Sequence, residues 1–490
     1  MCPRSQDQAS LPDESAFMTA ITSRASTTFQ TIEQFQHRDD RGGGIQHNGL
    51  PSKTPEEATA RLWRGSAGWP DKNGDGRYDV TYTFREPPED KHQRQHNKSG
   101  FTHVLENQRQ QTRRSLQSIA DVANVRFTEG PKTASSEGHI TLGNYADLYN
   151  KKGQSVAAYP QTSLPNPKDR FSGDAWFVDT KDDQSVPNAS HGDAGRFTLV
   201  HELGHALGLS HPSQYDVSSG SAKAGYLEDS ESHTTMSYLG ERHGYMNHGG
   251  IRASAPQLDD ISAYQQEYGA NHETRKDDTT YGFNSNTDRD FLSVKADQDK
   301  MVAAIWDGGG TDTLDFSGYQ QDQQISLKAG TFSDVGGLKG NVSIAYGVTI
   351  ENALGGFGND LLVGNDVANT LNGGEGNDRI YGAGGADILW GGKGNDVFVY
   401  GKTNESTRDA PDQIMDFVSG EDRVDVSGIR ATLGDKPLTF VRAFSGASGE
   451  AMVTYDPAVQ RSTLQISGEP DEPAFLLVVH GKLQQSDIVS

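Results

Sequence analysis

The sequence predicts two structured domains of different class: an α+β domain with a mixed sheet plus helices, and after it an all-β domain built as a parallel β-roll. Three observations predict this. Helix-like and strand-like segments alternate in the first half, a histidine motif typical of a metal-binding helix follows at residues 201–211, and a nine-residue repeat begins at residue 355. With 490 residues, the chain is long enough for separate cores.

Composition narrows the class of protein. The chain carries 67 acidic and 44 basic residues, a net charge of −23, which disfavours nucleic acid and anionic membranes as partners. The single cysteine, Cys2, excludes an intrachain disulfide and a cysteine-rich metal site. The sequence contains no run of eighteen apolar residues, so it predicts no membrane span. The first residues lack the apolar core of a secretory signal peptide. By these signs alone we would expect a cytoplasmic protein.

The elements before the histidine motif follow from periodicity. The first forty residues are polar and weakly periodic, and residues 1–41 are expected to be a propeptide or disordered leader. Apolar spacing predicts helices and strands, with helices over 55–65 and 105–124 and strands of a mixed sheet over 78–84 and 138–143.

Residues 201–211 read H-E-x-x-H-x-x-G-x-x-H. His201 and His205 are four residues apart, so on a helix they share one face and together bind one metal ion. Gly208 is expected to take a positive φ, end the helix and turn the chain so that His211 becomes the third ligand. Three protein ligands leave one position open for water, which Glu202 polarises, and this indicates a catalytic zinc site. The motif therefore predicts a zinc-dependent hydrolase, against a degenerate relic that binds no metal.

A methionine and a tyrosine follow the third histidine. Met236 is predicted to form an apolar floor under the imidazoles, and Tyr238 to act as a switchable extra zinc ligand or as an oxyanion stabiliser. The alternative is that both are ordinary core residues. Placed after this histidine motif, they are similar to the Met-turn of the metzincins. Residues 155–159 are expected to form the edge strand that pairs with an extended substrate, giving broad specificity.

Five nine-residue units begin at Gly355. The sixth position of each unit holds Asp360, Asn369, Asp378, Asp387 and Asp396, and the eighth holds Leu362, Leu371, Ile380, Leu389 and Phe398. Glycines form a tight turn whose carbonyls join the aspartate in binding calcium, while the eighth residue points into a shared core. A flexible linker would not keep this apolar period. The expected ligands are Gly356, Gly358, Asp360, Gly373, Gly374, Gly376, Asp378, Gly382, Gly385, Asp387, Gly391, Gly392, Gly394 and Asp396. The second unit lacks the acidic residue, so its site is expected to be weak or empty.

Other acidic segments are less regular. Residues 306–315 look like a diverged repeat with Asp307 and Asp312 as ligands, whereas Asp297 and Asp299 are expected on a solvated surface. Residues 71–79 match the opening of an EF-type loop, but position twelve lacks the bidentate glutamate. A turn before a strand is the favoured reading, and an extra calcium site is the alternative. The remaining histidines lack ligand spacing and are expected at the surface or rim: His191, His233, His243 and His248.

A metzincin motif followed by a calcium β-roll resembles the serralysins, secreted alkaline metalloproteases. The resemblance covers nearly all the chain after about residue 40, including residues 115–124, 281–287 and 336–344. It implies His201, His205 and His211 as zinc ligands, Glu202 as catalytic base and Tyr238 as extra ligand. It also implies further calcium ligands at Arg275, Thr279, Asp307, Gly309 and Asp312, and another site at Gly310, Thr349 and Glu351. Asp277 stands where the family usually has glycine within the first of these sites.

The resemblance also changes the expected localisation. Serralysins leave the cell unfolded through a type I (ABC) exporter that reads an uncleaved C-terminal signal, so no N-terminal signal is expected, and calcium folds the roll outside. The implied domains are a leader (1–41), a zinc metalloprotease domain (42–271) and a calcium-binding roll with the secretion signal (272–490). Ser490 replaces a usually apolar last residue. The implied partners of this monomer are protein and peptide substrates, the exporter and a small periplasmic protein inhibitor.

One alternative class remains open on the sequence. The chain would then be a catalytically silent adhesin or toxin module whose roll binds a surface while the zinc site is vestigial. Intact Glu202 and Tyr238 argue against it. A different metzincin is disfavoured because the Met-x-Tyr spacing occurs together with the calcium repeats.

Overall fold

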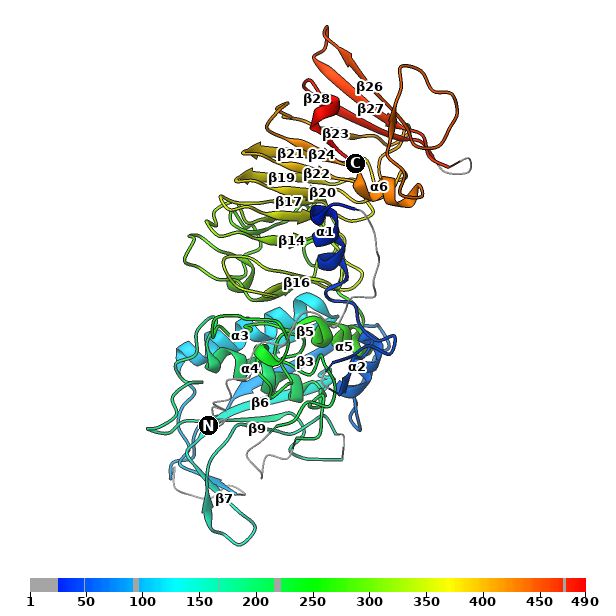
Figure 1. Ribbon diagram of the computed structural model, residues 1–490. Coiled ribbons are helices and arrows are strands. Elements are labelled where there is room, and N and C mark those ends of the chain that lie inside the picture. Colours follow the sequence, from blue (N-terminus) through cyan, green and yellow to red (C-terminus); the bar gives the residue numbers. More distant parts are fainter. Residues whose placement is uncertain (1–24, 48, 91–96, 167, 216–221, 470–472) are drawn as a thin grey trace.

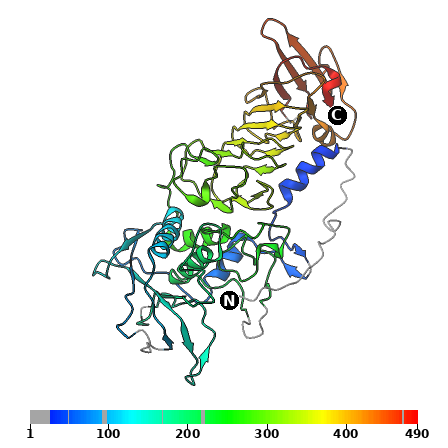
Figure 2. The same cartoon turned by 90° about the vertical axis from the view of Figure 1, so that its left-hand side faces the viewer.

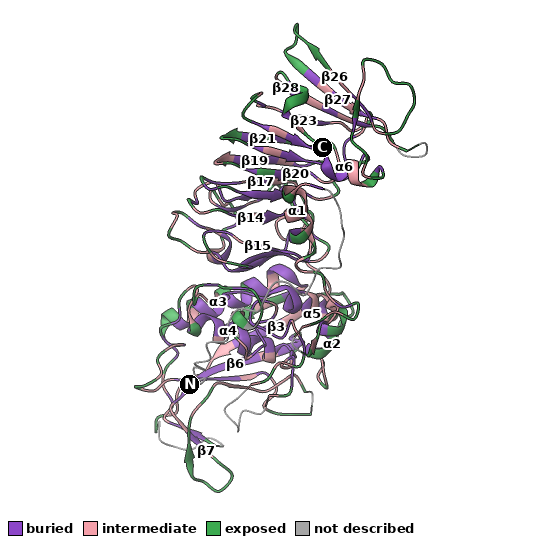
Figure 3. Ribbon diagram, in the orientation of Figure 1, coloured by how far each residue is buried: buried purple, intermediate pink, exposed green. Residues whose placement is uncertain are grey.

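The computed structural model describes residues 25–490 except 48, 91–96, 167, 216–221 and 470–472. An α+β part and a long β-roll lie one above the other, and the roll extends away from the first part along its own axis (Figure 1). Buried residues concentrate in the helices and sheet of the first part and between the two faces of the roll (Figure 3). In the described part of the chain, no helix is long and apolar enough to cross a membrane.

The α+β part is built on a five-stranded sheet with the order β5-β3-β6-β10-β9, in which only the edge strand β9 runs antiparallel to its neighbour. Its strands are β3 Tyr78–Phe84, β5 Val125–Glu129, β6 Gly138–Tyr145, β9 Gln161–Thr162 and β10 Asp174–Val178. The helices are α2 Pro55–Leu62, α3 Glu106–Val122, α4 Ala194–Ala206 and α5 Leu258–Tyr268. A small hairpin joins β1 Gln46–His47 to β2 Leu50–Pro51. The helices and strands predicted around residues 55–65, 105–124, 78–84 and 138–143 are confirmed.

Of the edge strand predicted at residues 155–159, only residues 155–156 form a strand, and that strand lies at the edge of a different sheet from the one expected. Residues 155–156 form β8, which pairs with β7 (Asp147–Tyr149) in a separate three-stranded sheet completed by β4 (Lys98–Ser99). A tight turn at Gly153, whose φ is +76°, folds β8 back onto the strand just before it. The outer strand of the main sheet is instead β9, a few residues further along.

The roll winds in parallel half-turns. One face contains β17 Asn352–Leu354, β19 Thr370–Glu375 and β21 Ile388–Lys393, and the other contains β18 Leu361–Val363, β20 Arg379–Tyr381 and β22 Val397–Val399. Partners in neighbouring turns lie eighteen residues apart, as in the pair Leu362 and Ile380. All five residues at the eighth repeat position are completely buried. The predicted parallel β-roll with its apolar ladder is confirmed.

The rest of the second part extends the roll at both ends. Before the repeats come β11 Thr280–Gly282, β12 Ala303–Ile305, β13 Thr313–Asp315, β14 Gln324–Ser326, β15 Phe332–Ser333 and β16 Val342–Ile344. After them come β23 Asp412–Ile414, β24 Arg423–Asp425, α6 Ser427–Thr432, β25 Thr439–Phe440, β26 Glu450–Asp456, β27 Arg461–Ile466, β28 Phe475–His480 and β29 Ile488–Val489. Strands β26, β27 and β28 are antiparallel and continue the ten-stranded sheet.

Helix α1 (Thr27–His37) lies along the side of the roll, although disorder was expected there (Figure 2). Its residues Ile32 and Phe35 are buried against Leu361 and Val363 of β18. This contact stabilises a helix whose own sequence has little periodicity, because the apolar partners come from a distant part of the chain. For residues 27–37 the structure replaces the expected disorder by a packed helix, and residues 1–24 lie outside the described residues.

Candidate zinc and calcium sites

Helix α4 carries the first two histidines and ends where the sequence predicts. Its first turn is capped by Asp193, whose carboxylate accepts a hydrogen bond from the Arg196 amide at 2.8 Å. Gly208 has a φ of +107°, and a Cβ there would lie 2.7 Å from the Ala67 carbonyl oxygen. Only glycine fits this turn, which directs the chain to His211.

The three histidines converge on one point. The Nε2 atoms of His205 and His211 are 3.1 Å apart, and those of His211 and His201 are 3.3 Å apart. In the other direction, Nδ1 of His201 lies 2.8 Å from the Thr235 carbonyl and Nδ1 of His205 lies 2.6 Å from the Leu209 carbonyl. Donation from Nδ1 leaves the Nε2 lone pairs of these two rings facing inward, as metal ligation requires.

The electrostatics of this cluster fit a bound cation. Burial lowers the pKa of His205 to about 4 and that of His211 to about 3, and it lowers the pKa of His201 well below its usual value. Neutral imidazoles with converging lone pairs repel one another unless a cation lies between them. Three nitrogen donors suit zinc, and His201, His205 and His211 are the one group of potential ligands of this kind among the described residues.

Glu202 lies beside the histidines and is buried. Burial raises the pKa of its carboxyl to about 7, and the hydroxyl of Thr162 donates a hydrogen bond to it at 2.7 Å. A carboxylate with a pKa near neutrality both accepts and releases a proton readily. Thr162 belongs to the edge strand β9, and the sequence contains no motif that would have identified it.

The predicted methionine floor is in place. Met236 is fully buried beneath α4, where a Cβ on Gly204 would lie 2.5 Å from the methionine sulfur. Asp260 of α5 fixes the turn, because its carboxylate accepts hydrogen bonds from the Thr235 amide at 2.7 Å and from the Thr235 hydroxyl at 2.8 Å. The Thr235 carbonyl in turn holds His201, so Asp260 acts on the histidine cluster through the backbone. The sequence did not predict this role of Asp260.

Tyr238 is also brought to the cluster. Its ring centroid lies 4.4 Å from that of His211, and the ring stacks on that of Tyr215 at 4.9 Å. The Tyr215 hydroxyl donates to Asp229, which also accepts from the Ser237 hydroxyl at 2.8 Å. Tyr215, held by Asp229, thus packs beside both Tyr238 and His211, and neither Tyr215 nor Asp229 was predicted.

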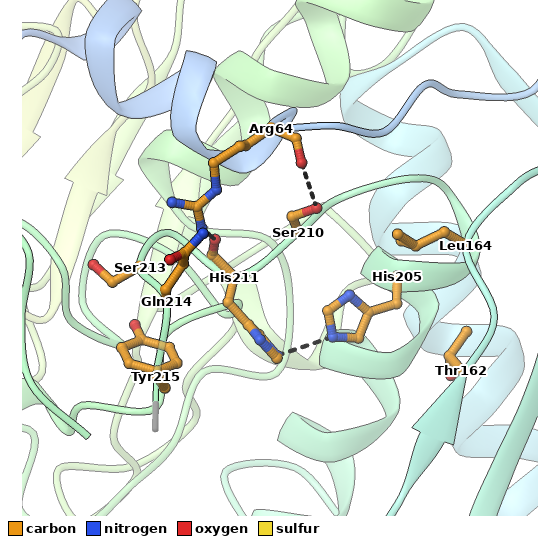
Figure 4. Close-up of a pocket in the computed structure, with 9 residues that line it drawn as sticks. All are labelled: Arg64, Thr162, Leu164, His205, Ser210, His211, Ser213, Gln214 and Tyr215. Carbon is orange, nitrogen blue, oxygen red and sulfur yellow. Dashed lines mark hydrogen bonds between the residues drawn. The ribbon is translucent and has the colours of Figure 1, made fainter. Parts of the chain in front are cut away.

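A cleft of about 540 Å³ opens on the histidines. Figure 4 labels the nine residues that line it: Thr162 and Leu164 lie near His205 on the right, and Ser213, Gln214 and Tyr215 lie on the left, with His211 between them. Every lining residue except Leu164 has a polar or charged group in its side chain.

The repeat loops place carboxylates in the positions predicted for calcium. Asp378 and Asp387 are buried, each with one oxygen accepting a backbone N–H and the other oxygen without a hydrogen bond, as is also true of Asp312 and Asp412. Burial raises the pKa of Asp378 to about 8 and that of Asp387 to about 9. Buried, unsatisfied carboxylate oxygens at successive turns fit a hard cation such as calcium.

Comparison with known proteins assigns the family. A family described as Matrixin matches residues 78–218, and one described as Peptidase M10 serralysin C terminal matches residues 270–490. The metallopeptidase AprA of Pseudomonas marginalis is 47% identical over 95% of this chain and 97% of its own length. The metalloprotease AprA of Pseudomonas entomophila is 46% identical over 97% and 99%, and the serralysin of Photorhabdus sp. (strain Az29) is 44% identical over 91% and 91%. The chain belongs to the serralysin family.

The family membership makes this chain a zinc metalloendopeptidase. Among solved structures, the solution structure of the AlgE6R2 subunit of the Azotobacter vinelandii mannuronan C5-epimerase is similar at 22% identity over 36% of this chain and 91% of that chain. Its TM-score of 0.20 is too low to support a conclusion.

In this member of the serralysin family, most of the residues predicted near the domain junction lie together. The Thr279 amide donates to Asp312 at 2.7 Å, and the Asp312 amide donates to Glu351 at 2.7 Å. Asp307 accepts from the Gly309 amide at 2.6 Å. Gly310 is close to the Asp277 backbone, where an added Cβ would lie 2.8 Å from the Asp277 carbonyl carbon. Thr349 lies exposed just before Glu351 in the chain.

The Arg275 side chain is held by fixed acceptors. Its guanidinium donates to the Trp306 carbonyl, next to Asp307 in the chain, at 2.6 Å and to Asp121 at 3.0 Å. The φ of Arg275 is +49°, a conformation that non-glycine residues rarely adopt. A cationic side chain held in this way leaves the carbonyl oxygen as the ligand that this residue can offer.

In the loop at residues 71–79 and in the second repeat unit, the polar side chains form hydrogen bonds within their own turns. In the loop at residues 71–79, Asp71 accepts hydrogen bonds from the Gly74 amide at 2.6 Å and from the Gly76 amide at 2.9 Å, which supports the turn. Asn369 of the second repeat donates its amide N–H to Asn365 at 3.0 Å. The expected surface position is wrong for His248, which is buried and contacts the Gly340 carbonyl at 3.0 Å, because the roll packs over it.

Proposed function

We propose that this chain is a secreted endopeptidase of broad specificity that hydrolyses peptide bonds in proteins. His201, His205 and His211 would hold the catalytic zinc, with Glu202 as general base and Tyr238 as extra ligand and transition-state stabiliser. The convergence of three histidine nitrogens beside a buried carboxylate supports this proposal most directly. The edge strand β9, whose outer side has no strand partner among the described residues, supports backbone recognition of an extended peptide.

Each residue has a distinct task in the proposed mechanism. Zinc, when bound, supplies Lewis-acid chemistry that acidifies water and polarises a carbonyl. Glu202 takes the proton of the attacking water and passes it to the leaving amine, a task that suits a carboxyl with a pKa of about 7. Thr162 orients the Glu202 carboxylate through its hydrogen bond. The Tyr238 phenol donates a hydrogen bond to the oxyanion of the tetrahedral intermediate.

The test is the substitution Glu202→Gln in the zinc-loaded protein. We expect kcat on casein to fall by about 10²–10⁴-fold, because the general base is lost while the shape is kept. Bound zinc should equal that of the wild type, since Glu202 is not a ligand. Chelation should abolish wild-type activity and added zinc should restore it. Equal activity in the variant, or activity that resists the chelator, would contradict the proposed mechanism. A folded wild type that cleaves no casein would favour the silent adhesin or toxin module.

We also propose that calcium binds the repeat loops and the junction. The ligands would be the glycines and aspartates of the repeats, together with Arg275, Asp277, Thr279, Asp307, Gly309 and Asp312 in one junction site and Gly310, Thr349 and Glu351 in another. The unpaired oxygens of Asp312, Asp378 and Asp387 support this assignment.

Delivery would follow from the same chemistry. In calcium-poor cytosol the buried carboxylates disfavour the folded roll, so the chain would pass unfolded through a type I exporter and fold outside. Residues 1–41 would then contain the propeptide, followed by the protease domain (42–271) and the roll with its export signal (272–490). Protein substrates, the exporter and a small periplasmic protein inhibitor are the partners that this route implies.

A further inference from the structure

Arg64 lies on the wall of the cleft beside His205 and His211. It follows the end of α2, and backbone contacts fix this segment against the turn that carries the third histidine. The Ser210 amide donates to the Leu62 carbonyl at 2.6 Å. The position of Arg64 relative to the metal cluster is therefore set by the fold and not by its own side chain.

The guanidinium of Arg64 is anchored on one side only. Its Nη2 donates to the His211 carbonyl at 3.0 Å, and among the described residues this is its one hydrogen bond. In Figure 4 the group lies next to Gln214 and above the His211 ring. Arginine has five N–H donors in a planar fork that matches the two oxygens of a carboxylate, so donors remain for a ligand.

The charge of the cleft favours an acidic ligand. Of the nine lining residues, Arg64 is the one with a permanent charge, and none is acidic. The nearby Asp229 lies behind the wall, where its carboxylate accepts the hydroxyls of Ser213 and Tyr215 and forms no ion pair with Arg64. The zinc that the three histidines would hold adds further positive charge. The lining residues and the metal ion thus supply positive charge at this cleft, although the net charge of the chain is −23.

We propose that Arg64 is a specificity-determining residue that binds the side-chain carboxylate of an aspartate or glutamate in the substrate, close to the scissile bond. This rests on the peptidase activity proposed above. Arg64 forms the same bidentate pair with either acid, while the edge strand binds the substrate backbone. Cleavage is broad at the other positions and selective for an acid at the one that faces Arg64.

The test uses a set of peptides that share one scissile bond. The three positions on either side of that bond are varied one at a time, with glutamate in one peptide and glutamine in its partner. We expect kcat/KM of the wild type to favour glutamate by about tenfold at one position, as a charge-assisted hydrogen bond would give. This preference should shrink in high salt, because the pair is partly open to solvent.

Substitutions of Arg64 distinguish a role in recognising the substrate from a role in supporting the His211 loop. Arg64→Gln should reduce the preference to within about twofold, Arg64→Lys should keep part of it, and Arg64→Glu should favour lysine over glutamine at the same position. Arg61→Gln is the matched control, since Arg61 is exposed in the last turn of α2, three residues before Arg64, and does not line the cleft. It removes the same charge and should leave the preference unchanged.

Two results would overturn the assignment. One is a wild type that cleaves all peptides but does not distinguish glutamate from glutamine at any position, which needs no variant to be seen. The other is an Arg64→Gln enzyme that loses the same factor on both peptides, because Arg64 would then only support the His211 loop. A wild type that cleaves none of the peptides or casein would instead contradict the proposed peptidase function.

Discussion

Asp260 lies far from the histidine motif in the sequence, yet its carboxylate fixes the turn whose carbonyl holds His201. Thr162 plays a similar part for Glu202, as does Asp229 for the tyrosines beside the cluster. An aspartate or threonine is common at turns and helix starts, so its type alone does not reveal such a role. Single residues of the motif were predictable because metal chemistry restricts them, whereas their supports were not.

Gly204 packs closely against Met236 in the helix that carries His201 and His205. Substitution by alanine places a Cβ 2.5 Å from the Met236 sulfur, which must then move within a filled core. We expect Gly204→Ala to destabilise the protein by about 1–3 kcal/mol and to lower activity, because the floor under the histidines shifts. Thermal unfolding and casein cleavage measure the two effects.

Gly240→Ala is the matched control for this substitution. Gly240 is exposed, has a φ of −63°, and has no heavy atom within 4 Å of the position that its Cβ would take. Its melting temperature and activity should equal those of the wild type. A Gly204→Ala protein as stable as this control would show that the methionine floor adapts freely.

At the scale of elements, the nine-residue period identified the strands of the roll but not its full length. The regular period ends near residue 399, and yet the ladder of aspartates continues. The Asp387 amide donates to Asp412 at 2.9 Å and the Asp396 amide donates to Asp422 at 3.0 Å. Longer connections separate these residues in the sequence, so periodicity cannot find them although the strands still stack.

The repeat loops differ in what their sixth residue offers to calcium. Asp378 has a buried carboxylate oxygen without a hydrogen bond, whereas the side-chain NH₂ of Asn369 already donates to the Asn365 side chain. We expect Asp378→Asn to remove about one calcium ion per chain and to lower the melting temperature in calcium, since a charged ligand is lost. Asn369→Ala should leave the calcium content unchanged. Equilibrium dialysis of the full chain measures both.

The loop at residues 71–79 provides a second comparison at this scale. Asp71 uses both carboxylate oxygens within its own turn, so Asp71→Ala should also leave the calcium content unchanged. Loss of a calcium ion in this variant would establish the EF-type site instead. An Asp378→Asn protein with unaltered calcium content would contradict the assignment of the repeat loops.

At the scale of the whole molecule, the segment after residue 24 joins the two parts. Arg38 pairs with Asp334 of the roll at 3.0 Å, and Arg41 forms a bidentate pair with Asp259 of α5 at 2.7 and 3.1 Å. Burial alone would lower the pKa of Arg41, but Asp259 raises it, so the pair stays charged. The position of the amino-terminal segment thus depends on the folded roll on one side and on helix α5 on the other.

Calcium-free protein should become less stable as the pH rises. The pKa of Asp378 is raised to about 8 in the folded state and lies near 3.9 in an unfolded chain, so between these values the folded state holds more protons. Stability then falls with rising pH, because ionisation of the buried carboxyl favours unfolding. We expect the melting temperature of calcium-stripped protein to fall by about 5 °C or more between pH 5 and pH 8.

Calcium should remove this dependence, since the ion binds the ionised carboxylates. Melting curves of the same preparation with saturating calcium, at equal ionic strength, provide the comparison. A calcium-stripped protein whose melting temperature stays level or rises over this pH range would show that the aspartates are not buried without the ion.

The sequence by itself predicted the cluster of His201, His205 and His211 with Glu202 beside it, and the repeating strands, because helix and strand periods place residues close in sequence at known positions. Only the tertiary structure decided that β9 borders the site, that α1 packs on the roll, that Asp260 fixes the turn that holds His201, and that Arg64 lines the cleft. Those contacts join residues from distant segments. No local period records them, since they depend on how whole elements pack.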